Sequence, residues 1–158
     1  MIAGALRRSA RAVATRWKLR RCELRGEAEA RGTIWIHGAG RITLGDGVRL
    51  DGSWAPIELH AGAGAEIVID DGVQIDGGVS IEAQRSVRIG AGSRVGRFCK
   101  ILDNHFHRTA ARDERPQSTP IVVEEDVDLG VRATLLPGAH LGRAAIVRAG
   151  TVVARRIP

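Results

Sequence analysis

The side chains best suited to chemistry lie in one short segment, residues 101–107, which reads ILDNHFH. It holds two histidines, His105 and His107, and the carboxylate of Asp103. Imidazole has an unperturbed pKa near neutrality, so a positioned histidine can take a proton as a general base. The plain alternative is a pair of solvated loop histidines. The place of this segment in the fold therefore decides what it does.

A metal site is the second chemistry that histidines could support. Catalytic zinc needs three protein ligands, and the only close pair here is His105 and His107, with His140 far along the chain. The two cysteines, Cys22 and Cys99, are far apart in sequence and do not form a disulfide framework. We therefore expect no metal.

Charge is distributed unevenly along the chain. Residues 1–25 carry eight basic side chains and one acidic one, whereas residues 26–158 carry 16 basic and 17 acidic side chains. A nucleic-acid groove needs a basic stripe on the folded body, so the net charge of +6 does not predict a nucleic-acid partner. Arginines interrupt the apolar runs near the N-terminus, so we expect neither a signal peptide nor a membrane span, and predict a cytoplasmic protein.

An aliphatic residue recurs at every sixth position within groups of three. A small or β-branched residue commonly stands two positions earlier, as Ala133 does before Leu135. Two inward side chains and a turn form a short strand and a corner, so three hexads close one triangular coil. The series comprises Ile69, Ile75, Ile81, Ile89, Val95, Ile101, Val123, Leu129, Leu135, Leu141, Val147 and Val153.

The interruptions of this series are as informative as its regularity. Two extra residues fall near Ala83–Ser86, and a much longer insertion separates Ile101 from Val123. An earlier, less regular coil is expected around residues 42–50, with an irregularity near Trp54. A β-sandwich lacks a strict six-residue period. We predict an all-β fold, a parallel β-helix of hexapeptide repeats over residues 26–158.

Residues 40–158 resemble the hexapeptide-repeat O-acetyltransferases, which are left-handed parallel β-helices. The stretch from residue 121, IVVEEDVDLGVRATLLPGAHLGRAAIVRAGTVVARRIP, is similar to their V-W-I-G-A, I-L-P-G-V-x-I-G and A-G-S-V-V-T-K-D-I-P text. ILDNHFH looks like the I-x-D-N-D/N-F-H of the maltose/galactoside-acetyltransferase-like branch that acts on polysaccharides. The resemblance implies a left-handed coil and transfer of an acetyl group from acetyl-coenzyme A to a saccharide hydroxyl.

The resemblance also implies acid–base and acceptor roles. His107 matches the family's general base, and His105, where the family has Asp or Asn, is the second candidate. Asp103 could orient the imidazole, although an aspartate before Asn104 is equally typical of a turn. Asp76 matches an asparagine that contacts the acceptor sugar, and it could still accept a hydrogen bond from a hydroxyl.

The coenzyme A contacts follow from the same resemblance. The thioester oxygen becomes anionic in the transition state and needs a fixed donor, and the matching backbone N–H is that of Val131. Ala149 and Gly150 match the small residues that line the pantetheine arm, and Arg155 replaces a lysine and could meet a phosphate. Asp128 stands where the family has tryptophan.

The long insertion predicts a protruding loop over about residues 104–120, NHFHRTAARDERPQSTP, which contains two prolines and no Ile, Leu or Val. In the family such loops reach the neighbouring subunit and wall the active site. The resemblance therefore implies a homotrimer with three active sites between its subunits.

The N-terminal arm, residues 1–25, predicts a basic amphipathic helix. One fate is a cap on the open end of the coil. The other is an anchor on anionic lipid, with Trp17 at the interface, which would place the protein on the inner membrane face. The apolar positions at helical spacing are Ile2, Leu6, Ala10, Val13, Trp17 and Leu24.

Two further functions compete with acyl transfer. A non-catalytic scaffold or assembly protein that kept the coils is favoured by the two departures at Asp76 and Asp128. A zinc enzyme of carbonic anhydrase type shares the hexad, but its three histidine ligands have no counterpart in the spacing seen here.

Overall fold

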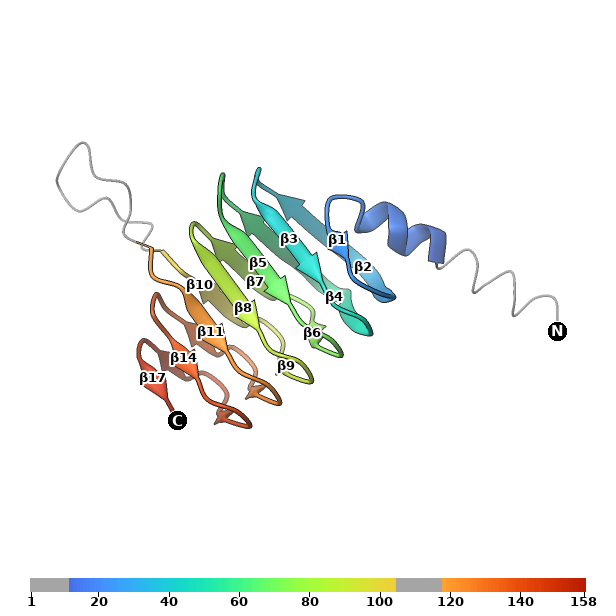
Figure 1. Ribbon diagram of the computed structural model, residues 1–158. Coiled ribbons are helices and arrows are strands. Elements are labelled where there is room, and N and C mark those ends of the chain that lie inside the picture. Colours follow the sequence, from blue (N-terminus) through green and yellow to red (C-terminus); the bar gives the residue numbers. More distant parts are fainter. Residues whose placement is uncertain (1–11, 105–117) are drawn as a thin grey trace.

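The structure is a computed structural model that describes residues 12–104 and 118–158. The described chain is a stack of β-coils with one short helical segment, residues 12–18, at its N-terminal end (Figure 1). Each strand pairs in parallel with the equivalent strands of the coils before and after it. These residues therefore confirm the predicted all-β fold of parallel repeats.

The strands form three faces. Face one is a seven-stranded sheet, whereas faces two and three belong to one ten-stranded sheet that bends, because β2 (Ala28–His37) and β4 (Val48–Ala61) each run across both. Face one contains β1 (Glu23–Leu24), β3 (Arg41–Leu44), β5 (Glu66–Ile69), β8 (Ser86–Ile89), β11 (Ile121–Val123), β14 (His140–Leu141) and β17 (Arg156–Ile157). Face two continues with β6 (Gln74–Asp76), β9 (Arg94–Val95), β12 (Asp128–Leu129) and β15 (Ile146–Val147), and face three with β7 (Ser80–Ala83), β10 (Lys100–Leu102), β13 (Thr134–Leu135) and β16 (Val152–Val153).

The interior of the stack is an aliphatic column. All twelve positions of the six-residue series are buried, which confirms the predicted inward face. Strands of two to four residues are unstable alone, and they persist here because each coil buries its apolar side chains against two neighbours. Each buried methylene contributes roughly 0.8 kcal/mol, so the column is the main source of stability.

Three corners connect the faces, and we number them in chain order. Corner one leads from face one to face two, corner two from face two to face three, and corner three back to face one. At corner one from Gly47 onward, and at corner two from Gly78 onward, one residue per coil has a left-handed φ. These residues are Gly47, Gly72, Gly92, Asp126 and Ala144 at corner one, and Gly78, Phe98, Arg132 and Gly150 at corner two.

The two extra residues near Ala83–Ser86 are accommodated at corner three, as predicted. Ile69 pairs with Ile89, 20 residues later, whereas Val123 pairs with Leu141, 18 residues later. The extra length bulges without disturbing the buried column on either side.

The earlier coil is also confirmed, together with its irregularity. Ile42, Leu44 and Leu50 are buried. The register between β2 and β4 shifts between Gly32 and Ile34, opposite the segment that contains Trp54.

The helical segment caps the first coil, at the opposite end of the stack from β17 (Figure 1). Leu19 is buried with the core. Thr15 Oγ1 accepts a hydrogen bond from the Ala30 N–H at 3.3 Å, and Lys18 Nζ donates to the Gly32 carbonyl at 2.6 Å. The described residues thus favour the cap of the two predicted fates.

The predicted helical range, residues 1–25, extends too far at its C-terminal end. Glu23 and Leu24 form β1, whose parallel partner is β3. The chain leaves the helix after residue 18 because Leu19 enters the core and Arg21 donates to the carbonyls of Ile36 and Gly38, at 3.2 and 2.8 Å. No helix in the described ranges has the length and the apolar run needed to cross a membrane.

Candidate functional site

The predicted general base, His107, lies outside the described residues, as do His105 and most of the loop. The structure does describe the base of that loop, at corner three. Asn104 forms an antiparallel bridge with Ser118, and the Thr119 N–H donates to the Asp103 carbonyl at 2.8 Å. The loop therefore leaves and re-enters the coil at one point, directly above the two-residue bulge.

The Asp103 carboxylate supports that bulge. It is fully buried. One oxygen accepts the N–H of Gln84 at 2.7 Å, and the other accepts those of Arg85 and Ser86 at 2.7 and 2.8 Å. These bonds hold the extra residues and the loop base together. That Asp103 orients the imidazole of His107 stays a prediction.

Three of the predicted coenzyme A contacts come together at corner two. Val131 and Gly150 occupy successive coils, and the Gly150 N–H donates to the Val131 carbonyl at 2.8 Å. Ala149 and Gly150 are exposed, and a Cβ at Gly150 would meet nothing within 4 Å. This end of corner two therefore offers an open strip of backbone to which a narrow chain can lie close.

Asp76 lies on the same corner, two coils earlier than Val131. It ends β6 opposite Asp51 and lines a cleft of about 220 Å³ together with Arg31 and Arg49. The predicted acceptor contact, Asp76, and the predicted coenzyme A contacts, Val131, Ala149 and Gly150, therefore all lie at corner two.

Arg155 does not join them. It lies at corner three, between β16 and β17, and its carbonyl accepts the His140 N–H at 3.4 Å. Corners two and three are the two edges of face three, six residues or roughly 20 Å apart at most. Within one chain, the loop base and Arg155 thus lie across a face from Val131, Gly150 and Asp76.

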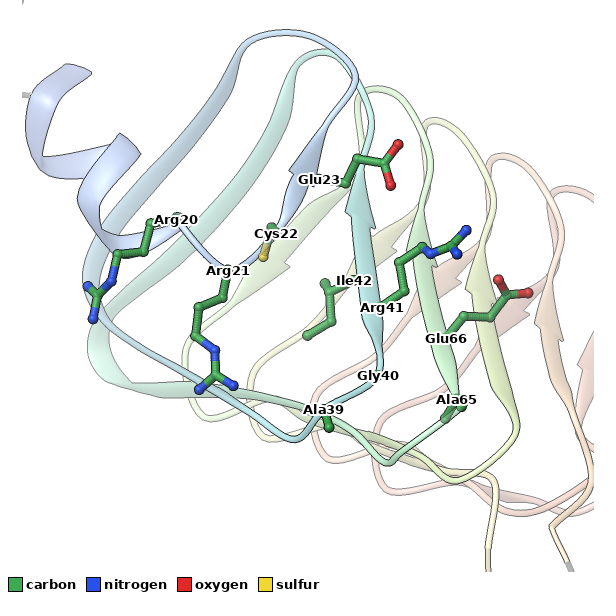
Figure 2. A pocket seen from close by; sticks show the side chains of 11 residues that line it. Arg20, Arg21, Cys22, Glu23, Ala39, Gly40, Arg41, Ile42, Ala65 and Glu66 are labelled. Atoms are coloured by element: carbon green, nitrogen blue, oxygen red, sulfur yellow. The ribbon is translucent and has the colours of Figure 1, made fainter.

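A larger cleft, of about 620 Å³, lies at the capped end of the stack (Figure 2). Arg20 and Arg21 approach it from the segment after the helix, and Arg41 and Glu66 from neighbouring strands of face one. Both guanidinium groups of the cap are already engaged, Arg21 with carbonyls of β2 and the adjoining turn and Arg20 with the Trp17 carbonyl at 3.2 Å. This cleft is built mainly from the contacts that hold the cap.

Neither cysteine is suited to nucleophilic chemistry. Burial raises the pKa of the Cys22 thiol to about 11 and that of Cys99 also to about 11. Both thiols are therefore protonated at neutral pH, and a protonated thiol is a poor nucleophile.

Among the described residues, one hydrogen-bonded histidine–carboxylate pair was missed by sequence reasoning. His140 Nε2 and Glu124 Oε1 are 2.7 Å apart on neighbouring coils, and Glu124 Oε2 accepts the Arg143 N–H at 2.9 Å. The hydrogen bond from His140 and then that from Arg143 lower the pKa of the Glu124 carboxyl. The 18-residue offset between coils is the signal that could have found the pair, because it places Glu124 beside Gly142, two residues after His140.

The remaining described histidines lie on face three. His37 and His60 are paired in register, and each lies 3.9 Å from a glutamate, Glu58 and Glu82 respectively. In the part of the chain that the structure describes, no three histidine, cysteine or acidic side chains gather as a metal site.

Comparisons with known proteins give two similarities. No protein-family model matches the chain. A stretch of 45 residues, 28% of this chain, is 40% identical to the 2,3,4,5-tetrahydropyridine-2,6-dicarboxylate N-acetyltransferases of Staphylococcus aureus strains JH9 and Newman, of which it covers 19%. The chain thus matches about a fifth of the length of these relatives. The crystal structure of the polySia specific acetyltransferase NeuO matches 86% of this chain and 80% of its own, with a TM-score of 0.47 and 13% identity.

Proposed function

We propose that this protein transfers an acetyl group from acetyl-coenzyme A to a hydroxyl of a saccharide, as part of a polysaccharide or a lipid-linked glycan precursor. The observation that carries the proposal is the open strip at corner two, where Val131, Ala149 and Gly150 lie together with Asp76 two coils away. The similarity to N-acetyltransferases over 45 residues supports acyl transfer as the chemistry.

In the proposed reaction the acceptor hydroxyl attacks the thioester carbonyl directly. His107 takes the hydroxyl proton as the general base, with His105 as the second candidate. The Val131 N–H stabilises the oxyanion that develops on the thioester oxygen, and the thiolate of coenzyme A leaves. The neutral thiols of Cys22 and Cys99 are consistent with transfer that forms no covalent enzyme intermediate.

The proposed assembly is a homotrimer of left-handed coils with an active site between each pair of subunits. The separation of the loop base at corner three from the strip at corner two supports this arrangement. A loop that crosses to the neighbouring subunit brings His107 to the neighbour's strip, whereas within one chain the width of face three lies between them.

The first test replaces one histidine at a time. His107→Ala is expected to reduce acetyl-coenzyme A-dependent transfer to a saccharide acceptor at least 100-fold, the usual contribution of a general base being about 10²–10⁴. His140→Ala is the matched control, because His140 also carries a carboxylate partner yet has no place in the proposed reaction. Near-normal turnover of the His107 variant, or loss in the His140 variant alone, contradicts the assigned base.

The second test distinguishes an enzyme from a non-catalytic scaffold that kept the coils. A ligand that binds only the native state raises its melting temperature, by an amount that grows with ligand concentration. Acetyl-coenzyme A at millimolar concentration is therefore expected to raise the melting temperature of the full chain. An unchanged melting temperature favours the scaffold. Asp76 and Asp128, which depart from the residues that the resembling family has at these positions, favour it as well.

The proposed location is the cytoplasm, with the protein held peripherally on the inner membrane face. Val13 and Trp17 are 69% and 67% exposed on the cap, and Arg20 stacks over the Trp17 ring with its Cζ 4.7 Å from the centroid. An aromatic ring beside a cation suits the headgroup region of anionic lipid. Co-sedimentation with anionic vesicles is expected for the wild type and is expected to fall in Trp17→Ala. Equal sedimentation of the two removes this part of the proposal.

A further inference from the structure

Corner two carries a row of aromatic and cationic side chains that the proposed reaction does not use. Arg97 Cζ lies 5.1 Å from the centroid of the Trp54 ring, and Arg132 Cζ lies 5.9 Å from that of Phe98. Trp54 is 80% exposed and Phe98 is 46% exposed. We call the four side chains Trp54, Arg97, Phe98 and Arg132 the corner ridge.

Two members of the ridge occupy a backbone conformation that disfavours side chains. Phe98 and Arg132 both have φ of 59°, and the equivalent residues one coil before and one coil after are glycines, Gly78 and Gly150. A residue with a Cβ is disfavoured in the left-handed region by roughly 1–2 kcal/mol. Strained residues of this kind are typical of functional positions. The fold itself requires nothing larger than glycine here, so the two side chains point to a role outside folding.

The side chains are also held in place. The Phe98 ring lies on Gly78, where an added Cβ would come within 2.3 Å of Phe98 Cδ1. Because Gly77 and Gly78 carry no side chains, Arg97 reaches past their coil to Trp54, which lies two coils away. Coils are about 4.8 Å apart, so the ridge is a pre-arranged strip of alternating rings and guanidinium groups.

Within the described part of the chain the guanidinium groups of the ridge form no close ion pair. Neither Arg97 nor Arg132, nor Arg148 farther along corner two, forms an ion pair there, whereas Arg88 on face one and Arg143 at corner one do. The pKa of the nearby Asp51 carboxyl is lowered mainly by its hydrogen bonds with Ser53, and the charge of Arg97 makes a smaller contribution. A guanidinium group binds a carboxylate through two parallel hydrogen bonds. An aromatic face offers an apolar surface to the C–H groups of a sugar ring. Together they suit a chain of sugars that carry carboxylates.

From this chemistry we propose that the acceptor is an acidic saccharide, whose carboxylates bind Arg97 and Arg132 and whose rings stack on Trp54 and Phe98. The inference rests on the proposed function and names its acceptor class. The ridge follows corner two past Asp76 toward Val131 and Gly150, so an acceptor bound along it leads toward the proposed donor strip.

The test measures binding without any acyl transfer. Labelled oligogalacturonate and hyaluronan oligosaccharides are titrated with the full chain, and binding is followed by fluorescence anisotropy beside a neutral maltooligosaccharide of equal length. Trp54→Ala, Arg97→Gln and Arg132→Gly are each expected to weaken binding of the acidic oligomers about tenfold, which corresponds to about 1.4 kcal/mol. Arg132→Gly retains the fold because it relieves the backbone conformation. Trp17→Ala and Arg20→Gln, which remove the equivalent stacked pair on the cap, are the matched controls and are expected to change binding less than twofold.

Four results would overturn the proposal. The first is that the neutral oligomer binds as tightly as the acidic ones, and the second is that neither acidic oligomer binds at millimolar sugar. The third is that the cap controls weaken binding as much as the ridge variants do. The fourth is that the ridge variants weaken acetyl-coenzyme A binding or self-association and leave saccharide binding unchanged. The melting-temperature shift with acetyl-coenzyme A is measured on the same variants. If the wild type shows that shift but no acidic saccharide binding, the acceptor class fails alone. If it shows neither, the proposed function fails as well.

Discussion

Corners one and two repeat the same left-handed backbone turn in successive coils, from Gly47 at corner one and from Gly78 at corner two, yet they carry different side chains. Corner one uses three glycines, then Asp126 and Ala144, which are small or tolerant of this conformation. Corner two places Phe98 and Arg132 there. Because the backbone requirement is the same, the difference reflects the surface that each corner presents. The repeat constrains the main chain, and the corners are where the protein departs from it.

Corner three differs from both, because it carries the two insertions. The bulge at residues 84–85 and the base of the long loop meet at one carboxylate, that of Asp103. Corner three is thus held by a fully buried carboxylate, whereas the side-chain acceptors at corner one include the exposed carboxylates of Asp46 and Asp71 and the hydroxyl of Ser93.

The largest effect is expected at corner three. Asp103→Ala leaves three backbone N–H groups without their acceptor and is expected to lower the free energy of unfolding by about 4 kcal/mol. Urea-induced unfolding followed by circular dichroism measures the change.

Asp71→Ala is the matched control at corner one. The exposed Asp71 carboxylate accepts a single backbone N–H, that of Asp46, at 2.8 Å. Its loss is expected to lower the free energy of unfolding by about 1 kcal/mol. Equal effects of the two substitutions would show that corner three is no more dependent on its carboxylate than corner one.

The next effect compares glycines at corners one and two. Gly78→Ala adds a Cβ against the Phe98 ring, whereas a Cβ at Gly72 has nothing nearer than 3.9 Å. We expect Gly78→Ala to lower the free energy of unfolding by about 3 kcal/mol and Gly72→Ala to lower it by about 1–2 kcal/mol. The effect at Gly72 comes only from the left-handed backbone conformation.

A double-mutant cycle separates the two contributions. In a Phe98→Ala background the added methyl group at position 78 has room, so its effect is expected to fall to that of Gly72→Ala. An unchanged effect in that background would falsify the assignment of the extra cost to the Phe98 ring.

A smaller effect concerns the non-glycine residues themselves. Ala144→Gly removes the strain of the left-handed conformation at corner one, but it also raises the conformational entropy of the unfolded chain. A net increase of about 0.5 kcal/mol in the free energy of unfolding is therefore expected. Thermal unfolding measures it. Arg132→Gly at corner two is expected to raise the free energy of unfolding by a similar amount and to weaken saccharide binding. A loss of stability there would mean that Arg132 serves the fold.

The smallest effect is a pH dependence on face one. The hydrogen bond from His140 lowers the folded-state pKa of Glu124 from its usual 4.5. The folded state therefore binds the proton less readily than the unfolded state, so this stabilisation is present above about pH 4.5 and is lost as the pH falls through the folded-state pKa. Glu124→Gln is expected to flatten the dependence of the melting temperature on pH below about pH 4.5, where the wild-type carboxyl loses this stabilisation. An unchanged slope would show that the pair contributes nothing.

Much of the fold was predictable because the inward positions obey a period. One inward aliphatic residue per hexad and a small or β-branched residue two positions earlier specify strand and burial from local sequence. The bulge near Ala83–Ser86 was predictable for the same reason, since it breaks the count. The predicted end of the cap helix was wrong, because Leu19, which lies outside the predicted apolar stripe, joins the core, whereas the stripe residues Val13 and Trp17 are exposed.

The candidate site was predictable only in part. Sequence motifs placed Val131, Ala149 and Gly150 together, and the structure brings them to one corner. Those motifs did not predict that Arg155 lies at a different corner, and they did not predict that His140 pairs with Glu124. Such pairs depend on which residues of successive coils lie opposite each other.

The sequence by itself determined the coil, its buried column and the positions of its two interruptions, because each follows from a repeat of six residues. Only the tertiary structure decided what lies side by side on the surface. Trp54 and Arg97 are 43 residues apart and stack because Trp54 belongs to an irregular coil and the coil between them carries a pair of glycines at this corner. The bulge meets the Asp103 carboxylate because the next coil lies directly above it. Outward side chains have no period of their own, so their neighbours are set by the stacking of the coils.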